Sequence, residues 1–140
     1  MGTSREHLTW LTGSSISQVK YHAPHEWLFE PSVGGQVRAF ASWRIVENRN
    51  VLSSSNELLA LLKYDEPVGA ATFDLPALAN RTVESAEVRD SPRDLLLLLS
   101  GGAILEILSL YSEAESWGVT SPDGFHLLGY PNGEIATWNG

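Results

Sequence analysis

The stretch that decides the fold is Leu95–Leu108, which reads LLLLLSGGAILEIL. Two apolar runs meet at Ser100-Gly101-Gly102, and each run is too short for a helix of ordinary length. Glycine at a two- or three-residue connection supplies the positive φ that a tight hairpin needs. The stretch therefore predicts a buried β-hairpin around which the rest of the chain packs.

The two arms of this hairpin distribute their apolar side chains differently. Residues 95–99 are leucine on both faces of the strand, which is typical of a central strand covered on both sides. In the second arm Glu106 lies between Ile104 and Leu108, on the same face of the strand. We therefore expect one face of that arm to approach solvent.

Length and composition indicate a single β-rich domain over residues 1–140. A chain of 140 residues buries enough surface for one core. It is 43% apolar, and its 12 Gly and 7 Pro are spread along the chain, which favours a compact β domain over disorder or a helix bundle. We expect residues 1–13 to be a short helical or loosely ordered lead-in. Because Cys is absent, disulfides, thiolate zinc sites and a cysteine nucleophile are excluded.

Nothing in the sequence predicts export or membrane insertion. Residues 1–18 are polar and lack the basic start and apolar core of a secretory signal. The longest apolar region, residues 95–108, is interrupted by polar residues and glycines and is shorter than the roughly 20 residues that a membrane helix requires. We therefore expect a cytoplasmic protein that does not bind membranes.

Alternation of apolar and polar side chains, punctuated by turn residues, predicts strands along most of the chain. One of them is a longer strand over residues 37–46, after the turn at Gly34-Gly35, and the last three form a meander. No internal repeat is strong enough to assign. Besides the hairpin, the predicted strands cover residues 14–21, 27–29, 37–46, 51–53, 82–89, 117–120, 125–128 and 134–138.

Two segments break the strand pattern. Residues 57–64 are rich in helix formers and follow Ser55 and Asn56, either of which suits an N-cap, so we expect a helix there and keep a strand as the alternative. Asp74 and Pro76 indicate a single helical turn capped by Asp74. The predicted fold is mainly β, with eight to ten strands in a curved antiparallel sheet or half-barrel and one or two short helices; an α+β architecture is the alternative.

No group of side chains has the composition of a catalytic or metal site. His22 and His25 flank a proline and lack a third ligand at a suitable spacing, and His126 lies alone in a predicted strand. Glu113 and Glu115 form one local patch rather than two carboxylates on opposite sides of a scissile bond. We therefore expect no enzymatic activity, no metal and no cofactor.

Five tryptophans are a high number for a chain of this length. Trp27, Trp43, Trp117 and Trp138 fall in predicted strands, where large aromatic side chains bury much area. We expect at least three tryptophans in the core. An exposed one would indicate a binding anchor.

The net charge of −8 is concentrated in the middle of the chain. Residues 1–56 carry five basic and four acidic side chains, residues 57–115 carry four and eleven, and residues 116–140 carry none and two. Such a field repels nucleic acid and attracts a basic protein, so we expect no nucleic-acid binding. Solubility alone is the other explanation of this charge.

Several motifs resemble those of a family of small, mostly uncharacterised, β-rich bacterial proteins. They are Ser42-Trp43-Arg44-Ile45, Glu115-Ser116-Trp117, Pro122-Asp123-Gly124 and PNGEIATW at residues 131–138. Some members of that family serve as immunity proteins of contact-dependent or other polymorphic toxins. The resemblance implies a β-dominated fold and a partner that is neutralised, and it brings no catalytic residues.

Charge and resemblance together predict a cytoplasmic immunity protein that binds a cognate toxin domain through an acidic surface. Toxins that attack nucleic acids have basic clefts, for which an acidic surface competes. The alternative is a small-ligand or structural binding module on a tryptophan-lined curved sheet. The predicted partner-binding residues are Glu57, Asp65, Glu66, Glu84, Glu87, Glu113 and Glu115.

Overall fold

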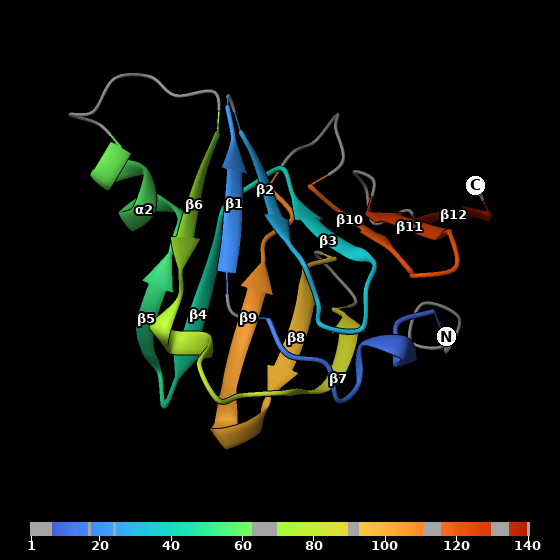
Figure 1. The fold of residues 1–140 in the computed structure, drawn as a ribbon, viewed down its shortest axis with the longest axis horizontal. Helices are drawn as coiled ribbons and strands as arrows, with labels where there is room; N and C mark the ends of the chain where they lie inside the picture. The colour runs from blue at the N-terminus through green and yellow to red at the C-terminus, as the bar shows by residue number, and fades with distance from the viewer. Residues whose placement is uncertain are drawn as a thin grey trace.

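The computed structural model describes residues 7–16, 18–23, 25–62, 70–89, 93–110, 116–129 and 135–139, the last of these by their backbone. In this part of the chain, twelve strands form two antiparallel sheets (Figure 1). Sheet A has the order β12-β11-β10-β3-β2-β1-β6 and sheet B the order β5-β4-β9-β8-β7. The mainly β fold predicted from the sequence is confirmed, and its strands are divided between two layers.

The strands of sheet A are β1 (Gln18–His22), β2 (Glu26–Phe29), β3 (Gln36–Ala39), β6 (Ala70–Asp74), β10 (Trp117–Thr120), β11 (Phe125–Gly129) and β12 (Ile135–Asn139). Those of sheet B are β4 (Trp43–Glu47), β5 (Asn50–Ser54), β7 (Val83–Val88), β8 (Leu95–Leu99) and β9 (Ala103–Ile107). The helical elements are η1 (Thr9–Leu11), α2 (Ser55–Leu62), η2 (Pro76–Leu78) and η3 (Ser100–Gly102). Figure 1 shows α2, β5 and β6 at one side of the molecule and β10–β12 at the other.

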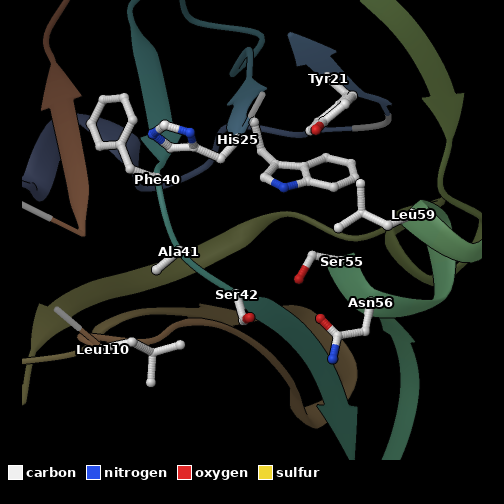
Figure 2. Close-up of a pocket in the computed structure, with 10 residues that line it drawn as sticks. Tyr21, His25, Phe40, Ala41, Ser42, Ser55, Asn56, Leu59 and Leu110 are labelled. Atoms are coloured by element: carbon white, nitrogen blue, oxygen red, sulfur yellow. The ribbon is translucent and has the colours of Figure 1, made fainter. Parts of the chain in front are cut away.

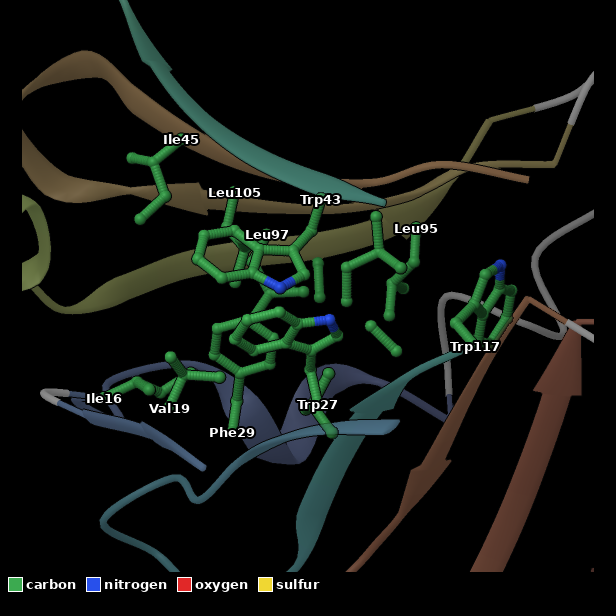
Figure 3. Close-up of a cluster of buried hydrophobic side chains, with 14 of the residues drawn as sticks. Ile16, Val19, Trp27, Phe29, Trp43, Ile45, Leu95, Leu97, Leu105 and Trp117 are labelled. Carbon is green, nitrogen blue, oxygen red and sulfur yellow. The ribbon is translucent and has the colours of Figure 1, made fainter. Parts of the chain in front are cut away.

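The core lies between the sheets and is rich in aromatic rings. Trp43 of sheet B meets Phe29 and Trp27 of sheet A edge to face, with ring centroids 5.2 and 5.5 Å apart (Figure 3). Leu97 and Leu105 of the β8–β9 hairpin are fully buried beside them. Trp27, Trp43 and Trp117 are each at most 3% exposed, which confirms that at least three tryptophans are core residues.

The predicted hairpin forms as β8 and β9, joined at Gly101 and Gly102, both with positive φ. Leu97 faces sheet A, and Leu96 and Leu98 lie on the other face of the strand. Leu96 is nevertheless buried, at 8% exposed, and only Leu98 is partly exposed, so most of β8 is buried on both faces, as predicted.

Three sequence predictions are corrected. The strand over residues 37–46 is two strands, β3 and β4, because the chain crosses from sheet A to sheet B at Phe40-Ala41-Ser42. Strand β6 was not expected, and the described residues form twelve strands rather than eight to ten. Asp74 does not cap η2; it accepts a hydrogen bond from Gln18 Nε2 at 2.8 Å, across the β1–β6 pair.

The helix predicted after β5 is confirmed as α2. Helix α2 begins at Ser55, two residues before the predicted start. The side chain of Ser54 accepts a hydrogen bond from the backbone N–H of Glu57 at 3.3 Å, so Ser54 supplies the cap rather than Ser55 or Asn56.

The two sheets repeat one pairing scheme, although the sequence shows no clear repeat. The order β11-β10-β3-β2-β1 in sheet A matches β5-β4-β9-β8-β7 in sheet B strand for strand. The register matches as well, because Trp117 is opposite Ala39 and Trp43 is opposite Ile107. The molecule therefore consists of two equivalent halves, β1–β5 and β7–β11, related by approximate twofold symmetry. Strands β6 and β12 extend sheet A at its two edges.

Hydrogen bonds outside the strands obey the same symmetry. Phe40 N donates to Ser116 O at 2.9 Å, and the equivalent Leu108 N donates to Ser42 O at 3.0 Å. These two bonds join the first crossover (residues 40–42), which leads from β3 to β4, to Leu108 and Ser116 at the two ends of the second, which leads from β9 to β10. The two halves are therefore linked at the point where each chain segment changes sheets.

Replacing Gly129 should destabilise the fold strongly. A Cβ at this position would overlap the indole of Trp117, which is fully buried and cannot yield. We expect Gly129→Ala to lower the free energy of unfolding by about 1–3 kcal/mol in urea denaturation. Gly118→Ala is the matched control, because its Cβ would meet only the flexible end of Leu128; an equal loss in both variants would contradict this explanation.

Candidate functional site

A pocket of about 140 Å³ opens at the end of the sandwich where the first crossover passes between the sheets (Figure 2). Helix α2 forms one wall, and the β1–β2 hairpin forms another. The lining residues are Tyr21, His25, Trp27, Phe40, Ala41, Ser42, Ser55, Asn56, Leu59 and Leu110. We refer to this site as the end pocket.

The wall formed by α2 is fixed to the crossover by Ser55. Its hydroxyl oxygen accepts a hydrogen bond from Trp43 N at 3.1 Å and lies 3.4 Å from Trp43 O, to which it can donate. Ser55 is only 2% exposed, so these bonds are shielded from water. The start of α2 is therefore held against the first residue of β4, and Asn56 and Leu59 are presented to the opening.

The size and lining of the end pocket suit one ring or one branched side chain. An apolar cavity of roughly 150 Å³ accepts a benzene molecule. The walls are largely aromatic, from Tyr21, Trp27 and Phe40, with hydroxyl and amide groups from Ser42 and Asn56 at the opening. Such a lining binds an apolar group and offers it a few hydrogen bonds.

Among the described residues that line the end pocket, His25 and Tyr21 are the only titratable side chains, and none is a carboxylate that could pair with the imidazole. Elsewhere in the described residues, no group of three or more His, Asp or Glu side chains could hold a metal ion.

Two leucines that line the end pocket are exposed, Leu59 at 39% and Leu110 at 58%. Leu61 is 64% exposed but lies two positions after Leu59 in α2, on a different side of the helix. Large apolar side chains gathered at an opening are characteristic of protein contact surfaces, in which an apolar centre carries most of the binding energy.

The structure separates the predicted partner-binding residues. Glu57 is exposed on α2, beside Asn56 of the end pocket. Glu84 and Glu87 lie on β7, the edge of sheet B opposite β5, with three strands in between, so the two edges are about 19 Å apart. Asp65, Glu66, Glu113 and Glu115 lie outside the described residues.

Most of the basic side chains in the described residues form ion pairs. Five basic side chains pair with carboxylates: Lys20 with Glu30 (3.0 Å), Arg38 with Glu26 (3.9 Å), Arg44 with Glu106 (2.6 Å), Arg81 with Glu47 (3.1 Å) and Arg89 with Asp94 (3.1 Å). Glu57, Glu84 and Glu87 make no ion pair with another described residue. No described basic side chain neutralises these three carboxylates.

Comparisons of the chain with protein-family models, with curated proteins and with solved structures give no match. The family resemblance carried by the tryptophan and turn motifs therefore stays a prediction. None of the helices among the described residues is long and apolar enough to cross a membrane.

The sequence did not reveal the end pocket, although it contains one signal for it, in α2. Phe40-Ala41-Ser42 continues the strand alternation, and only its neighbours in space show that the chain changes sheets there. Helix α2 carries leucine at positions 58, 59, 61 and 62, which is more than one helical face can bury. That excess could have indicated an exposed apolar surface.

Removing the Ser55 hydroxyl should loosen the wall of the end pocket. In Ser55→Ala the N–H of Trp43 keeps no partner in a buried position, so we expect the free energy of unfolding to fall by about 1–3 kcal/mol. Chemical denaturation followed by tryptophan fluorescence measures this loss. Ser53→Ala, on the neighbouring strand, should change stability much less, and equal effects would assign no special role to Ser55.

Proposed function

We propose that this protein is an immunity protein, which binds a cognate bacterial toxin domain in the cytoplasm and blocks its active site or substrate entry. The observation that carries the proposal is the end pocket with its exposed leucines and, beside it, Glu57, which makes no ion pair with another described residue. An apolar centre with a charged rim is the general form of a protein interface. In this proposal the pocket receives one anchoring side chain of the toxin, and Glu57 faces its basic surface.

The charge distribution supports a basic partner. Five basic side chains are paired with carboxylates. The net charge of −8 therefore comes from the remaining carboxylates, of which Glu57 is one. An acidic surface accelerates association with a basic cleft and makes it sensitive to salt. In the sequence, Asp65 and Glu66 follow α2, and Glu113 and Glu115 follow Leu110 of the pocket rim, so four further proposed contact residues come next to pocket elements along the chain.

The first test is co-purification of the tagged chain with the product of the gene immediately upstream, followed by titration calorimetry. We expect a complex with a dissociation constant in the nanomolar range that weakens as the salt concentration rises from about 50 to 500 mM. Lack of a complex with either neighbouring gene product would overturn the proposed function.

Two substitutions at the end pocket should weaken that complex, and one elsewhere should not. Leu59→Asp removes apolar contact at the rim and should raise the dissociation constant at least about tenfold. Glu57→Lys should slow association and reduce its salt dependence. Glu84→Lys changes the net charge equally on the far edge of sheet B; if it weakens binding as much as Glu57→Lys, the interface is not at the end pocket.

A second candidate function is the binding of a small aromatic molecule, favoured by the aromatic lining and the size of the end pocket. Indole is a suitable probe, with its ring against Trp27 and its N–H near Ser42. A saturable change in Trp fluorescence or thermal stability that Ala41→Leu abolishes would support this function over the first. Absence of any response at millimolar indole would eliminate it.

A further inference from the structure

The outer face of sheet B carries a row of apolar side chains across four strands. Val46 is paired with Val51 on one side and Ile104 on the other, and Ile104 is paired with Leu98. Their chain neighbours Ile45, Leu105 and Leu97 are fully buried in the core, so by alternation this row points outward. Val51 at the end of the row is 51% exposed, and Val46, Leu98 and Ile104 are partly exposed. We call Val46, Val51, Leu98 and Ile104 the outer row.

The other half of the molecule shows that the fold does not require this row. Sheet A places Gln36 opposite Thr120 at the positions where sheet B has Ile104 opposite Val46. The residue after Phe29 is Glu30, whereas the residue after the equivalent Leu97 is Leu98. Equivalent strands therefore accept polar side chains here, and the apolar choice in sheet B needs an explanation other than strand formation.

Charged residues beside the outer row are paired with one another. Glu106 is only 8% exposed, lies 2.6 Å from Arg44 and is within 3.9 Å of Arg89, which also pairs with Asp94 at 3.1 Å. This network contains two positive and two negative groups. Burying an unpaired charge is costly, and covering this face would bury none among these four residues.

We propose that the outer row is the contact surface for a second copy of this chain. Charges at its two ends are complementary: Glu84 and Glu87 on β7 have no ion pair with described residues, and neither has the exposed Arg49 in the β4–β5 turn. A twofold axis along the strands brings β7 of one copy over the β5 edge of the other, so that Glu84 of one copy lies at the end of the strands where Arg49 of the other copy is found. A basic partner is less suited to this face, because half-exposed Arg44 and Arg89 occupy it.

The dimensions of the face are compatible with such a contact. Five strands of about five residues give a flat footprint of roughly 400 Å², and the accessible surface of its side chains is larger. A standard interface buries about 800 Å² of accessible surface per partner. The dimer is therefore expected to be reversible and to dissociate in the micromolar range.

Sedimentation equilibrium of the purified chain up to roughly 100 µM tests the proposal. We expect a monomer–dimer equilibrium that shifts toward the dimer between about 50 and 500 mM NaCl, because salt screens the repulsion between copies of charge −8. A triple variant, Val46→Thr with Leu98→Glu and Ile104→Gln, copies the residues of the equivalent half and should be monomeric. A wild-type chain that stays monomeric at all these conditions would overturn the inference.

Two controls separate the outer row from general effects. Gln36→Glu adds one negative charge on the outside of sheet A and should leave the dimer intact. Arg49→Glu should weaken the dimer at least about threefold, and Glu84→Arg added to it should restore association. A dimer that persists in both the triple variant and Arg49→Glu would be formed by another surface, which would also refute the proposal.

Discussion

The structure depends on the mutual contact of the two crossovers. Each half of the chain begins in one sheet and ends in the other, so each sheet is completed by a strand from the opposite half: β10 joins β3, and β4 joins β9. The paired bonds from Phe40 to Ser116 and from Leu108 to Ser42 hold these exchanges together. Neither half could bury its apolar face alone, because its last strands belong to the other layer.

This exchange also creates the end pocket. A chain that leaves one sheet for the other cannot keep its side chains in the regular packing of either layer. At the first crossover the space is lined by Phe40 and Ser42 and closed by α2, which has no counterpart among the described residues of the other half. At the equivalent place in the second half Gly129 replaces Ser55, and the indole of Trp117 lies against it. Both halves bury an equivalent tryptophan, Trp43 or Trp117, and they differ in the residue beside it, Ser55 or Gly129.

The sequence predicted the local structure better than the arrangement in space. Turn glycines and the leucine run defined the β8–β9 hairpin because those signals are local. The division of residues 37–46 between two sheets was missed, because alternation is the same on both sides of the crossover. The repeat was hidden because equivalent positions hold different types of side chain. Trp27 corresponds to Leu95, and Gln36 corresponds to Ile104. Of the acidic residues, only Glu57 could be connected with the pocket, since charge patterns do not encode which strand edges are neighbours.

The two halves have the same backbone pairing and different surfaces, and this difference separates fold from function in one molecule. Residues that agree between the halves, such as Trp43 and Trp117 or Ser42 and Ser116, act in the core or at the crossovers. Residues that disagree occur in the core, as Trp27 and Leu95 do. They also occur on the outer faces of the sheets, as Thr120 and Val46 do, and at the end pocket, as Gly129 and Ser55 do. Because equivalent backbone positions tolerate either choice, the fold does not determine these side chains. Binding of an external partner therefore explains the side chains of the outer row and of the end pocket better than the requirements of the fold do.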